Sequence, residues 1–216
     1  MLKKNLKNEP TSSILHLVGA SLSVVGLVAL ILLGAFKGTV WHVVGFTVFG
    51  VGLFLLYLAS TLYHFFNDGT KAKKVFERID HSMIYVLIAA TYTPICLTIL
   101  RGTMGWIILS AVWITAIVGI TLKSAGVLKP GLFSTIIYVL MGWVIIAAFF
   151  PLINIIHISG FLWLLLGGIF YTVGAVFYQF DEVGSHTKAW GPHETFHVFV
   201  MLGSIMHYAF MILYLV

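Results

Sequence analysis

The chain has 216 residues, of which 60% are hydrophobic and 9% are charged, and its formal net charge is +5. An ordinary soluble domain carries about 25% charged residues, so this chain lacks the polar side chains that a soluble surface needs. The composition excludes a soluble enzyme and predicts an integral membrane protein. In such a protein the basic excess indicates topology and contact with anionic lipid, and it does not indicate nucleic-acid binding.

Charge-free segments predict the membrane spans, because each is close to the roughly 20 residues that cross the hydrocarbon core. The segments are continuously apolar and lack the alternation of a membrane strand, so they predict helices. The expected fold is an all-α membrane protein, a seven-transmembrane helix bundle that forms a single domain over residues 1–216. Its spans are expected at 14–35, 42–64, 80–100, 104–122, 132–150, 159–178 and 193–214.

Three segments carry further local signals. The span 14–35 is longer than the apolar region of a signal peptide and no A-x-A-like site follows it, so it is expected to stay as an anchor. Pro151-Leu-Ile-Asn154 is expected to form the turn between the fifth and sixth spans. The single cysteine, Cys96, excludes an intramolecular disulfide and a cysteine-based zinc site, and it is expected to pack inside the third span.

The basic residues predict the orientation of the bundle, because cytoplasmic loops of membrane proteins are rich in lysine and arginine. With the N-terminus in the cytoplasm, only Lys37 and Arg101 of the 12 basic residues lie outside. The others fall inside: Lys3, Lys4, Lys7, Lys71, Lys73, Lys74, Arg78, Lys123, Lys129 and Lys188. The acidic residues fall inside or at that interface: Glu9, Asp68, Glu77, Asp80, Asp181, Glu182 and Glu194. Trp41, Trp106 and Trp163 then lie near the outer interface, and the C-terminus is outside.

Residues able to bind a metal occur at three predicted span ends. His64 closes the second span, Asp80 opens the third, and His193 and His197 open the seventh. The last two are four residues apart, so they share one helix face. Imidazole and carboxylate groups are zinc ligands. Because the orientation brings all four residues to the cytoplasmic face, we expect His64, His193 and His197 to hold a zinc ion, with Asp80 in the same site as a fourth ligand or beside a bound water.

Three histidines and a water form the usual catalytic zinc site, which lowers the pKa of the water to about 7. Asp80 could orient that water, accept its proton or coordinate the ion. Ser60 lies four residues before His64 and shares its helix face, so it could hydrogen-bond a ligand or a developing oxyanion. Asp80 and Ser60 are therefore the candidate catalytic residues.

The remaining histidines are expected to have structural roles. His81 is turned about 100° around the helix from Asp80, so it supports the site at most. His207 lies too deep in the last span to share the ion, and we expect it to bond to a neighbouring helix. The rest are expected to be interfacial anchors or to bond between helices: His16, His42, His157 and His186.

The last histidine pair belongs to the pattern His193-Glu-Thr-Phe-His197. This is the H-E-x-x-H pattern of zinc proteases, in which the glutamate is the general base, and it raises an intramembrane metalloprotease as a minor alternative. Such an enzyme needs a further ligand, usually acidic and downstream, and no acidic residue follows His197. Glu194 is therefore expected to be solvated at the cytoplasmic interface, supporting the site at most.

Taken together, these motifs resemble the hemolysin III family, which belongs with the progestin and adipoQ receptors and, more distantly, the alkaline ceramidases. The resemblance covers nearly the whole chain and rests on seven spans with the N-terminus inside and on the metal motifs. Those motifs are Ser60-x-x-x-His64, Asp80 and His193-x-x-x-His197. Three contexts also resemble bacterial members: Glu9-Pro-Thr-Ser-Ser-Ile-Leu-His16, Tyr63-His64 and Ile79-Asp80-His81.

The resemblance implies a zinc ion bound by His64, His193 and His197, with Asp80 in the site directly or through a water, and Ser60 in the serine position of the superfamily. Glu194 is not part of the shared pattern. Receptor and ceramidase relatives are associated with hydrolysis of lipid amides, and bacterial members with membrane-fluidity homeostasis. The chain is thus expected to be a multi-pass protein of the bacterial plasma membrane whose partner is a membrane lipid or acyl-lipid substrate.

Several functions remain open from the sequence. The first is a zinc-dependent hydrolase of a ceramide-like lipid amide, or of an ester. The second is a non-catalytic, zinc-stabilised sensor or receptor-like regulator of the bilayer. A cytolysin follows from the family name, although the chain has no cleavable signal and no amphipathic segment that could insert on demand. A proton or ion channel is the weakest option, because His207 is the only deep titratable histidine to nominate.

Overall fold

The structure, a computed structural model, describes residues 8–179 and 190–216, and within these ranges it contains helices and no strand. The helices are α1 (Pro10–Lys37), α2 (Val40–Phe65), α3 (Lys71–Leu97), α4 (Thr103–Ser124), α5 (Leu132–Gly142), the 3₁₀ helix η1 (Trp143–Ala148), α6 (Phe149–Ile155), α7 (Ile158–Gln179) and α8 (Pro192–Tyr214). Some predicted loop residues lie outside the described residues: Lys3, Lys4, Lys7, Asp181, Glu182, His186 and Lys188.

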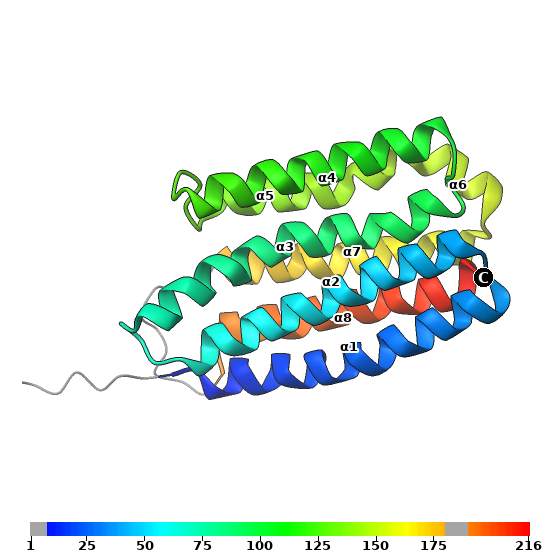
Figure 1. The fold of residues 1–216 in the computed structure, drawn as a ribbon. Helices are drawn as coiled ribbons and strands as arrows, with labels where there is room; N and C mark the ends of the chain where they lie inside the picture. Colours follow the sequence, from blue (N-terminus) through cyan, green and yellow to red (C-terminus); the bar gives the residue numbers. More distant parts are fainter. Residues whose placement is uncertain (1–7, 180–189) are drawn as a thin grey trace, which may run out of the picture.

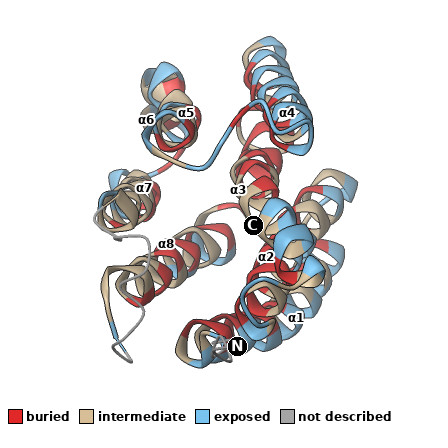
Figure 2. Cartoon of the chain, turned by 90° about the vertical axis from the view of Figure 1, so that its left-hand side faces the viewer, coloured by how far each residue is buried: buried red, intermediate tan, exposed pale blue. Residues whose placement is uncertain are grey.

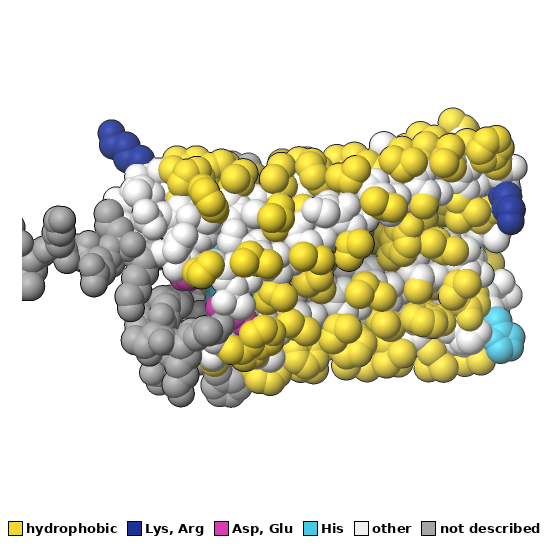
Figure 3. Space-filling view, turned by 90° about the horizontal axis from the view of Figure 1, so that it is seen from below, with side chains coloured by type: hydrophobic (Ala, Val, Ile, Leu, Met, Phe, Trp, Pro, Cys, Tyr) yellow, Lys and Arg dark blue, Asp and Glu magenta, His cyan; other side chains and the backbone are white. Residues whose placement is uncertain are grey.

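Six helical segments of the described chain are long and apolar enough to cross a membrane. They are α1, α2, α4, the continuous stretch Leu132–Ile155, α7 and α8. Figure 3 shows hydrophobic side chains over most of one face of the molecule, with charged side chains and a histidine near its two ends. Such a surface suits lipid in the middle and water at both ends. The prediction of an all-helical membrane protein is confirmed at this level.

The long helices run side by side. The C-terminal end of α2 and the N-terminal ends of α3 and α8 lie at the same end of the bundle, on the left of Figure 1. Viewed along the helices, α1, α2, α3, α5, α7 and α8 form a ring, while α4 packs on the outer side of α3 (Figure 2). This arrangement brings α8, the last helix, against α1, the first. Residues from both termini of the chain can therefore meet at one site.

Two glycines let α2 approach α3 closely. A Cβ atom added at Gly45 would lie 2.6 Å from the Cα atom of Pro94, and one added at Gly52 would lie 2.7 Å from the Cβ atom of Ala90. Small residues at a helix interface allow the backbones to approach, and the gain in packing holds membrane helices together. Close packing of α2 on α3 fixes the position of the α2 terminus relative to the residues of α3.

The start of α3 differs from the prediction that Asp80 opens the third segment. The helix begins at Lys71, and the Thr70 hydroxyl caps it by accepting a hydrogen bond from the Lys73 amide at 3.1 Å. Asp80 therefore lies more than two turns inside α3. The first turns of α3 are polar but rich in the good helix formers Lys, Ala, Glu and Arg, and the Thr70 cap adds to their stability as a helix.

The predicted turn at Pro151-Leu-Ile-Asn154 is wrong. These four residues lie within α6, and the chain turns at Ile156 and His157 instead. Pro151 is compatible with a helix here because it lies in the first turn of α6, where a backbone N–H has no partner within that helix.

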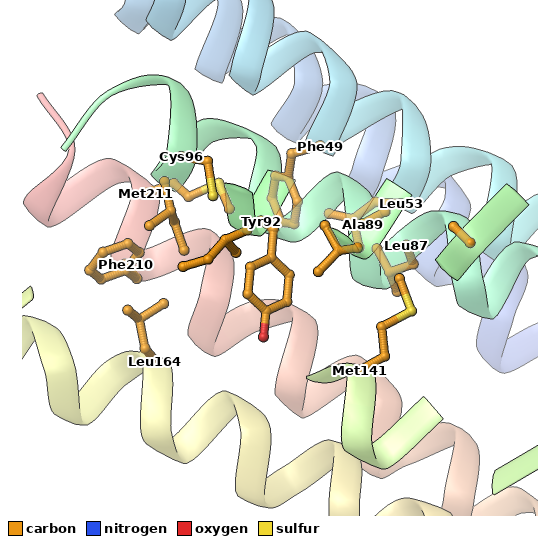
Figure 4. Close-up of a cluster of buried hydrophobic side chains, with 14 of the residues drawn as sticks. Phe49, Leu53, Leu87, Ala89, Tyr92, Cys96, Met141, Leu164, Phe210 and Met211 are labelled. Carbon is orange, nitrogen blue, oxygen red and sulfur yellow. The ribbon is translucent and has the colours of Figure 1, made fainter. Parts of the chain in front are cut away.

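Tyr92 of α3 makes hydrogen bonds to the backbone where α5 changes into the 3₁₀ helix η1. Its hydroxyl donates to the carbonyl oxygen of Gly142 at 2.5 Å and accepts from the amide of Ile145 at 2.9 Å. Figure 4 shows Tyr92 within a cluster of buried side chains that includes Met141 and Leu164. Where a helix becomes irregular in an apolar setting, the backbone groups that lose their helical partners need other hydrogen bonds. The Tyr92 hydroxyl bonds to two of these groups, one carbonyl oxygen and one amide.

Candidate metal centre

Three histidines from two helices meet at one end of the bundle. His64 lies in the last turn of α2, and His193 and His197 lie on the first two turns of α8. The Nε2 atom of His193 lies 3.3 Å from that of His64 and 3.1 Å from that of His197. The ligand atoms of all three residues lie within 4.8 Å of one another. The predicted convergence of these three residues is confirmed, and together they could hold a metal ion.

The spacing of the ring nitrogens suits a tetrahedral ion. Two Zn–N bonds of about 2.0–2.1 Å at a tetrahedral angle separate their nitrogens by about 3.4 Å. The two Nε2 separations on His193 are close to this value. His64 and His197 are almost fully buried, at 1% exposure each, whereas His193 is half-buried. The donor set therefore fits zinc, with an open side at His193.

Glu9, at the N-terminal end of α1, orients His64. The backbone amide of Glu9 donates to the backbone carbonyl of His64 at 3.1 Å, which places the two residues side by side. The Glu9 carboxylate also accepts a hydrogen bond from Nδ1 of His64. A proton held on Nδ1 leaves the Nε2 lone pair free for a metal, and a carboxylate on the far nitrogen is the usual support of a metal-binding histidine.

Lys73 of α3 completes this support. Its ammonium lies 3.2 Å from a Glu9 carboxylate oxygen and 3.3 Å from a carboxylate oxygen of Asp68. Partial burial raises the pKa of Glu9, but the hydrogen bond to His64 and the charges of His64 and Lys73 outweigh burial and lower this pKa to about 2. Glu9 is thus ionised at neutral pH. The chain of contacts links α1, α2 and α3 behind one face of the His64 ring.

His16 is also part of the site, unlike the interfacial anchor or hydrogen bond between helices that the sequence led us to expect. It is 2% exposed, and its ring stacks on that of His197 with centroids 3.8 Å apart and an angle of 14° between the planes. The edge of Tyr57 packs on it from α2 at 5.0 Å. Stacking restricts the rotation of His197, so α1 positions a candidate ligand on α8.

Glu194 is buried, at 9% exposure, and the expectation that it is solvated is wrong. One carboxylate oxygen accepts a hydrogen bond from the Ser12 hydroxyl at 2.8 Å, and the other accepts one from the Gly191 amide at 2.8 Å. The second contact caps the N-terminus of α8. One oxygen thus joins α8 to α1 and the other caps α8, and among the described residues Glu194 is not part of the group able to hold a metal, which is His64, His193 and His197.

Asp80 and Ser60 line a cavity that begins at the histidines. Among the described residues, the group able to hold a metal consists of His64, His193 and His197 and does not include Asp80, so the Asp80 carboxylate is not close to all three histidines at once. Asp80 nevertheless interacts electrostatically with His193 and lies near the Ser60 hydroxyl. The catalytic roles of Asp80 and Ser60 stay predictions.

The cavity extends from the metal end into the bundle. Its volume is about 150 Å³, and most of its wall is apolar. A second cavity of about 270 Å³ adjoins it and shares the lining residues Thr91, Tyr92, Gly142, Trp143, Gly168 and His207. Together they form a mainly apolar space whose acidic, lysine and histidine lining side chains, apart from His207, are gathered at the metal end: His16, Asp80, His81, Lys123, His193 and His197. Such a shape fits an amphiphile with a long chain.

The other histidines divide as follows. His81 lines the cavity near Asp80 but does not join the metal-capable group. His207 contacts the Leu164 carbonyl of α7 at 3.3 Å, as expected for a bond to a neighbouring helix. His42 contacts the Leu215 carbonyl at 2.7 Å and joins α2 to the end of α8. Cys96 is buried in the apolar core, as predicted.

The sequence prediction missed Glu9 and His16 as parts of the site, although a signal was present. Glu9, Ser12 and His16 follow one another at spacings of three and four residues, which places them on one face of a helix that carries no other ionisable residue before Lys37. Lys73 gave no comparable signal, because its contact with Glu9 joins residues of separate helices. A polar stripe on an apolar helix indicates a buried functional face.

Comparison with known proteins places the chain in a family. The family described as Haemolysin-III related matches residues 4–208. The chain is 44% identical to "Hemolysin-3 homolog" of Bacillus subtilis (strain 168) over 199 residues, which cover 92% of this chain and 90% of the relative. It is 43% identical to "Hemolysin-3" of Bacillus cereus over 209 residues, covering 97% and 92%.

A plant relative is more distant. "Heptahelical transmembrane protein 1" of Arabidopsis thaliana is 31% identical over 192 residues, which cover 79% of this chain and 56% of the relative. The family match spans nearly the whole chain, including α1, α2, α3 and most of α8. The resemblance seen in the sequence motifs is thereby confirmed, and the chain belongs to the hemolysin III family.

Proposed function

We propose that this protein is a zinc-dependent hydrolase of a lipid amide, or of an ester, that acts in membrane lipid homeostasis. One observation carries the proposal: a histidine cluster with zinc-like spacing stands at the polar end of a long apolar cavity. A cavity of this shape can accept an acyl chain and leave the scissile bond beside the histidines. Bacterial relatives support a place in the bacterial plasma membrane.

The proposal includes a seven-span topology with the N-terminus in the cytoplasm and spans near those predicted. α3 is the helix in question, because hydropathy alone does not mark it as a span among the described helices. It runs beside α2 and α4 along the bundle (Figure 1), which supports its crossing with them. Its polar residues Asp80 and His81 line the internal cavity and do not require contact with lipid. The name of the plant relative agrees with seven helices.

The residues at the polar end have separate roles in this proposal. His64, His193 and His197 hold the ion, which when bound supplies a water with a pKa of about 7 and polarises a carbonyl group. Asp80 orients the attacking water and accepts its proton. Ser60 donates a hydrogen bond to the oxygen of the substrate carbonyl as negative charge develops on it. Glu9 and His16 hold the ligands in place.

Metal analysis and lipid hydrolysis test the proposal in sequence. Wild type purified in mild detergent should carry about one zinc per chain, and His64→Ala and His197→Ala should carry none. Zinc-loaded wild type should then release fatty acid from a panel of acyl amides and esters, with His42→Ala as the matched histidine control. Wild type that refuses zinc would overturn the metal centre, and zinc-loaded wild type without turnover on the panel would overturn the hydrolase.

A non-catalytic sensor is the second candidate, because the metal-end contacts join four helices. Glu9 on α1, His64 on α2 and Lys73 on α3 are linked directly, and His197 adds α8. An ion there could report how these helices pack in the bilayer. Asp80→Ala separates the candidates: an enzyme keeps its metal and loses turnover, whereas a purely structural site mainly loses stability. No contact among the described residues favours a cytolysin or a protease over these two.

A further inference from the structure

Lys123 is a buried cation that the proposed chemistry does not use. The sequence places it among the loop lysines of the cytoplasmic face, but in the structure it lies in the last turn of α4 and is only 5% exposed. Its side chain lines the cavity that begins at the metal centre. The nearby lining residues Pro130, Gly131 and Ser134 belong to the connection between α4 and α5 and to the start of α5. Lys123 therefore stands at the polar end of the cavity.

The Lys123 ammonium has no counter-ion in direct contact. Among the described residues it makes no salt bridge. It makes a cation–π contact with Tyr138, whose ring centroid lies 5.8 Å from Nζ. Glu77 and Asp80 act on it electrostatically without an ion pair. Lys73, by comparison, is 7% exposed and contacts two carboxylates. A buried charge without a partner is costly unless a ligand or water supplies one.

The rest of the cavity wall indicates which kind of ligand could pair with the Lys123 ammonium. Beyond the polar end, the lining side chains are mostly apolar, as with Ile84, Leu87 and Val139. A small inorganic anion would leave this apolar length unfilled. An amphiphile that carries an oxyanion at one end of a long chain would satisfy both the ammonium and the wall. Asp80 interacts with both His193 and Lys123, so the lysine lies at the same end as the metal ligands.

We propose that Lys123 is an anion-binding group of the cavity, which selects single-chain amphiphiles whose head carries a carboxylate or a phosphate. The head comes from one of two sources: the fatty acid that hydrolysis releases, or a membrane lipid with an acidic headgroup. The inference concerns the same cavity as the proposed hydrolase. Binding, however, needs no metal and no turnover, so it holds or fails separately from hydrolysis.

Ligand binding to metal-free protein tests the inference. Full-length protein is purified in detergent and stripped with a chelator, and affinities are measured by calorimetry for three ligands with the same oleoyl chain. Mono-olein has a neutral head, lysophosphatidic acid adds a phosphate to it, and oleate carries a carboxylate. The variants are Lys123→Gln, Lys123→Arg and, as the matched control, Lys74→Gln, because Lys74 is an exposed lysine of α3 at the same end.

Wild type should bind at least one of the anionic ligands about tenfold or more tightly than mono-olein, as one charge-assisted contact predicts. Lys123→Gln should abolish this preference while leaving the affinity for mono-olein unchanged, and Lys123→Arg and Lys74→Gln should keep it. A preference for oleate alone indicates the fatty acid, and one for lysophosphatidic acid indicates the headgroup. The inference is overturned if wild type shows no preference for an anionic ligand over mono-olein, and this result does not depend on whether the variants fold. It is also overturned if the preference survives in Lys123→Gln.

Discussion

Glu9→Gln tests whether the carboxylate behind His64 supports metal binding. The substitution keeps the shape of the side chain and an acceptor oxygen for Nδ1 of His64, but it removes the negative charge. Asp68 is then the one carboxylate left in contact with Lys73 among the described residues, and because its side chain is 57% exposed it is a weak partner in water. The His64 ring loses a charged partner, and the charge of the nearby lysine is less well balanced.

The expected magnitude follows from the role of the contact. Losing a hydrogen-bond partner behind a metal ligand typically lowers metal affinity 10- to 100-fold, which corresponds to about 1.4–2.7 kcal/mol. The Glu9 contact is charged and backed by a lysine 3.2 Å away, so Glu9→Gln should fall within this range. Competition against a chromogenic zinc chelator, with detergent-purified protein, measures the affinity directly.

Asp68→Asn is the matched control. It removes the other carboxylate that contacts Lys73 but does not touch His64, so its zinc affinity should stay within about twofold of wild type, as expected for an exposed ion pair. The reasoning is refuted if Glu9→Gln binds zinc as tightly as wild type. It is equally refuted if Asp68→Asn weakens zinc as much as Glu9→Gln, since charge near Lys73 would then be the whole effect.

Three further predictions concern packing, the buried glutamate and the ion. Gly45→Ala should lower stability by about 1–3 kcal/mol, because the new methyl would lie 2.6 Å from the Cα atom of Pro94, whereas Gly142→Ala meets nothing within 4 Å; equal unfolding temperatures in detergent would contradict this. Glu194→Gln should lower stability by about 1–2 kcal/mol through weakened hydrogen bonds and leave zinc content unchanged, and loss of zinc would show that the carboxylate serves the ion. Chelation should lower the unfolding temperature and added zinc should restore it, since a ligand at 100 times its Kd adds about 2.7 kcal/mol; an unchanged temperature would speak against a metal centre.

Local sequence determined the helical class and the spacing within the metal motif. Continuously apolar, charge-free segments specify helices without reference to any neighbour, because a helix satisfies its backbone hydrogen bonds within its own segment, whereas a membrane strand needs paired neighbours and an alternating pattern. His193 and His197 share a helix face because they are four residues apart. For the same reason Ser60 could be assigned to the face of His64.

The tertiary structure decided what surrounds these residues. Glu9 reaches His64, and His16 stacks on His197, only because α1 packs against both α2 and α8. The turn after α6 lies at Ile156 and not at Pro151, because a proline in the first turn of a helix interrupts no hydrogen bond within it.

The environment of Lys123 also could not be predicted from the sequence alone. Composition assigned it to a water-facing loop, since lysines between apolar segments usually lie there. In the structure its side chain is buried and lines the cavity instead. Hydropathy and periodicity describe one segment at a time, so they predicted the helices and the ligand pair. The partners of a buried charge depend on which helices become neighbours, and only the assembled bundle determines that.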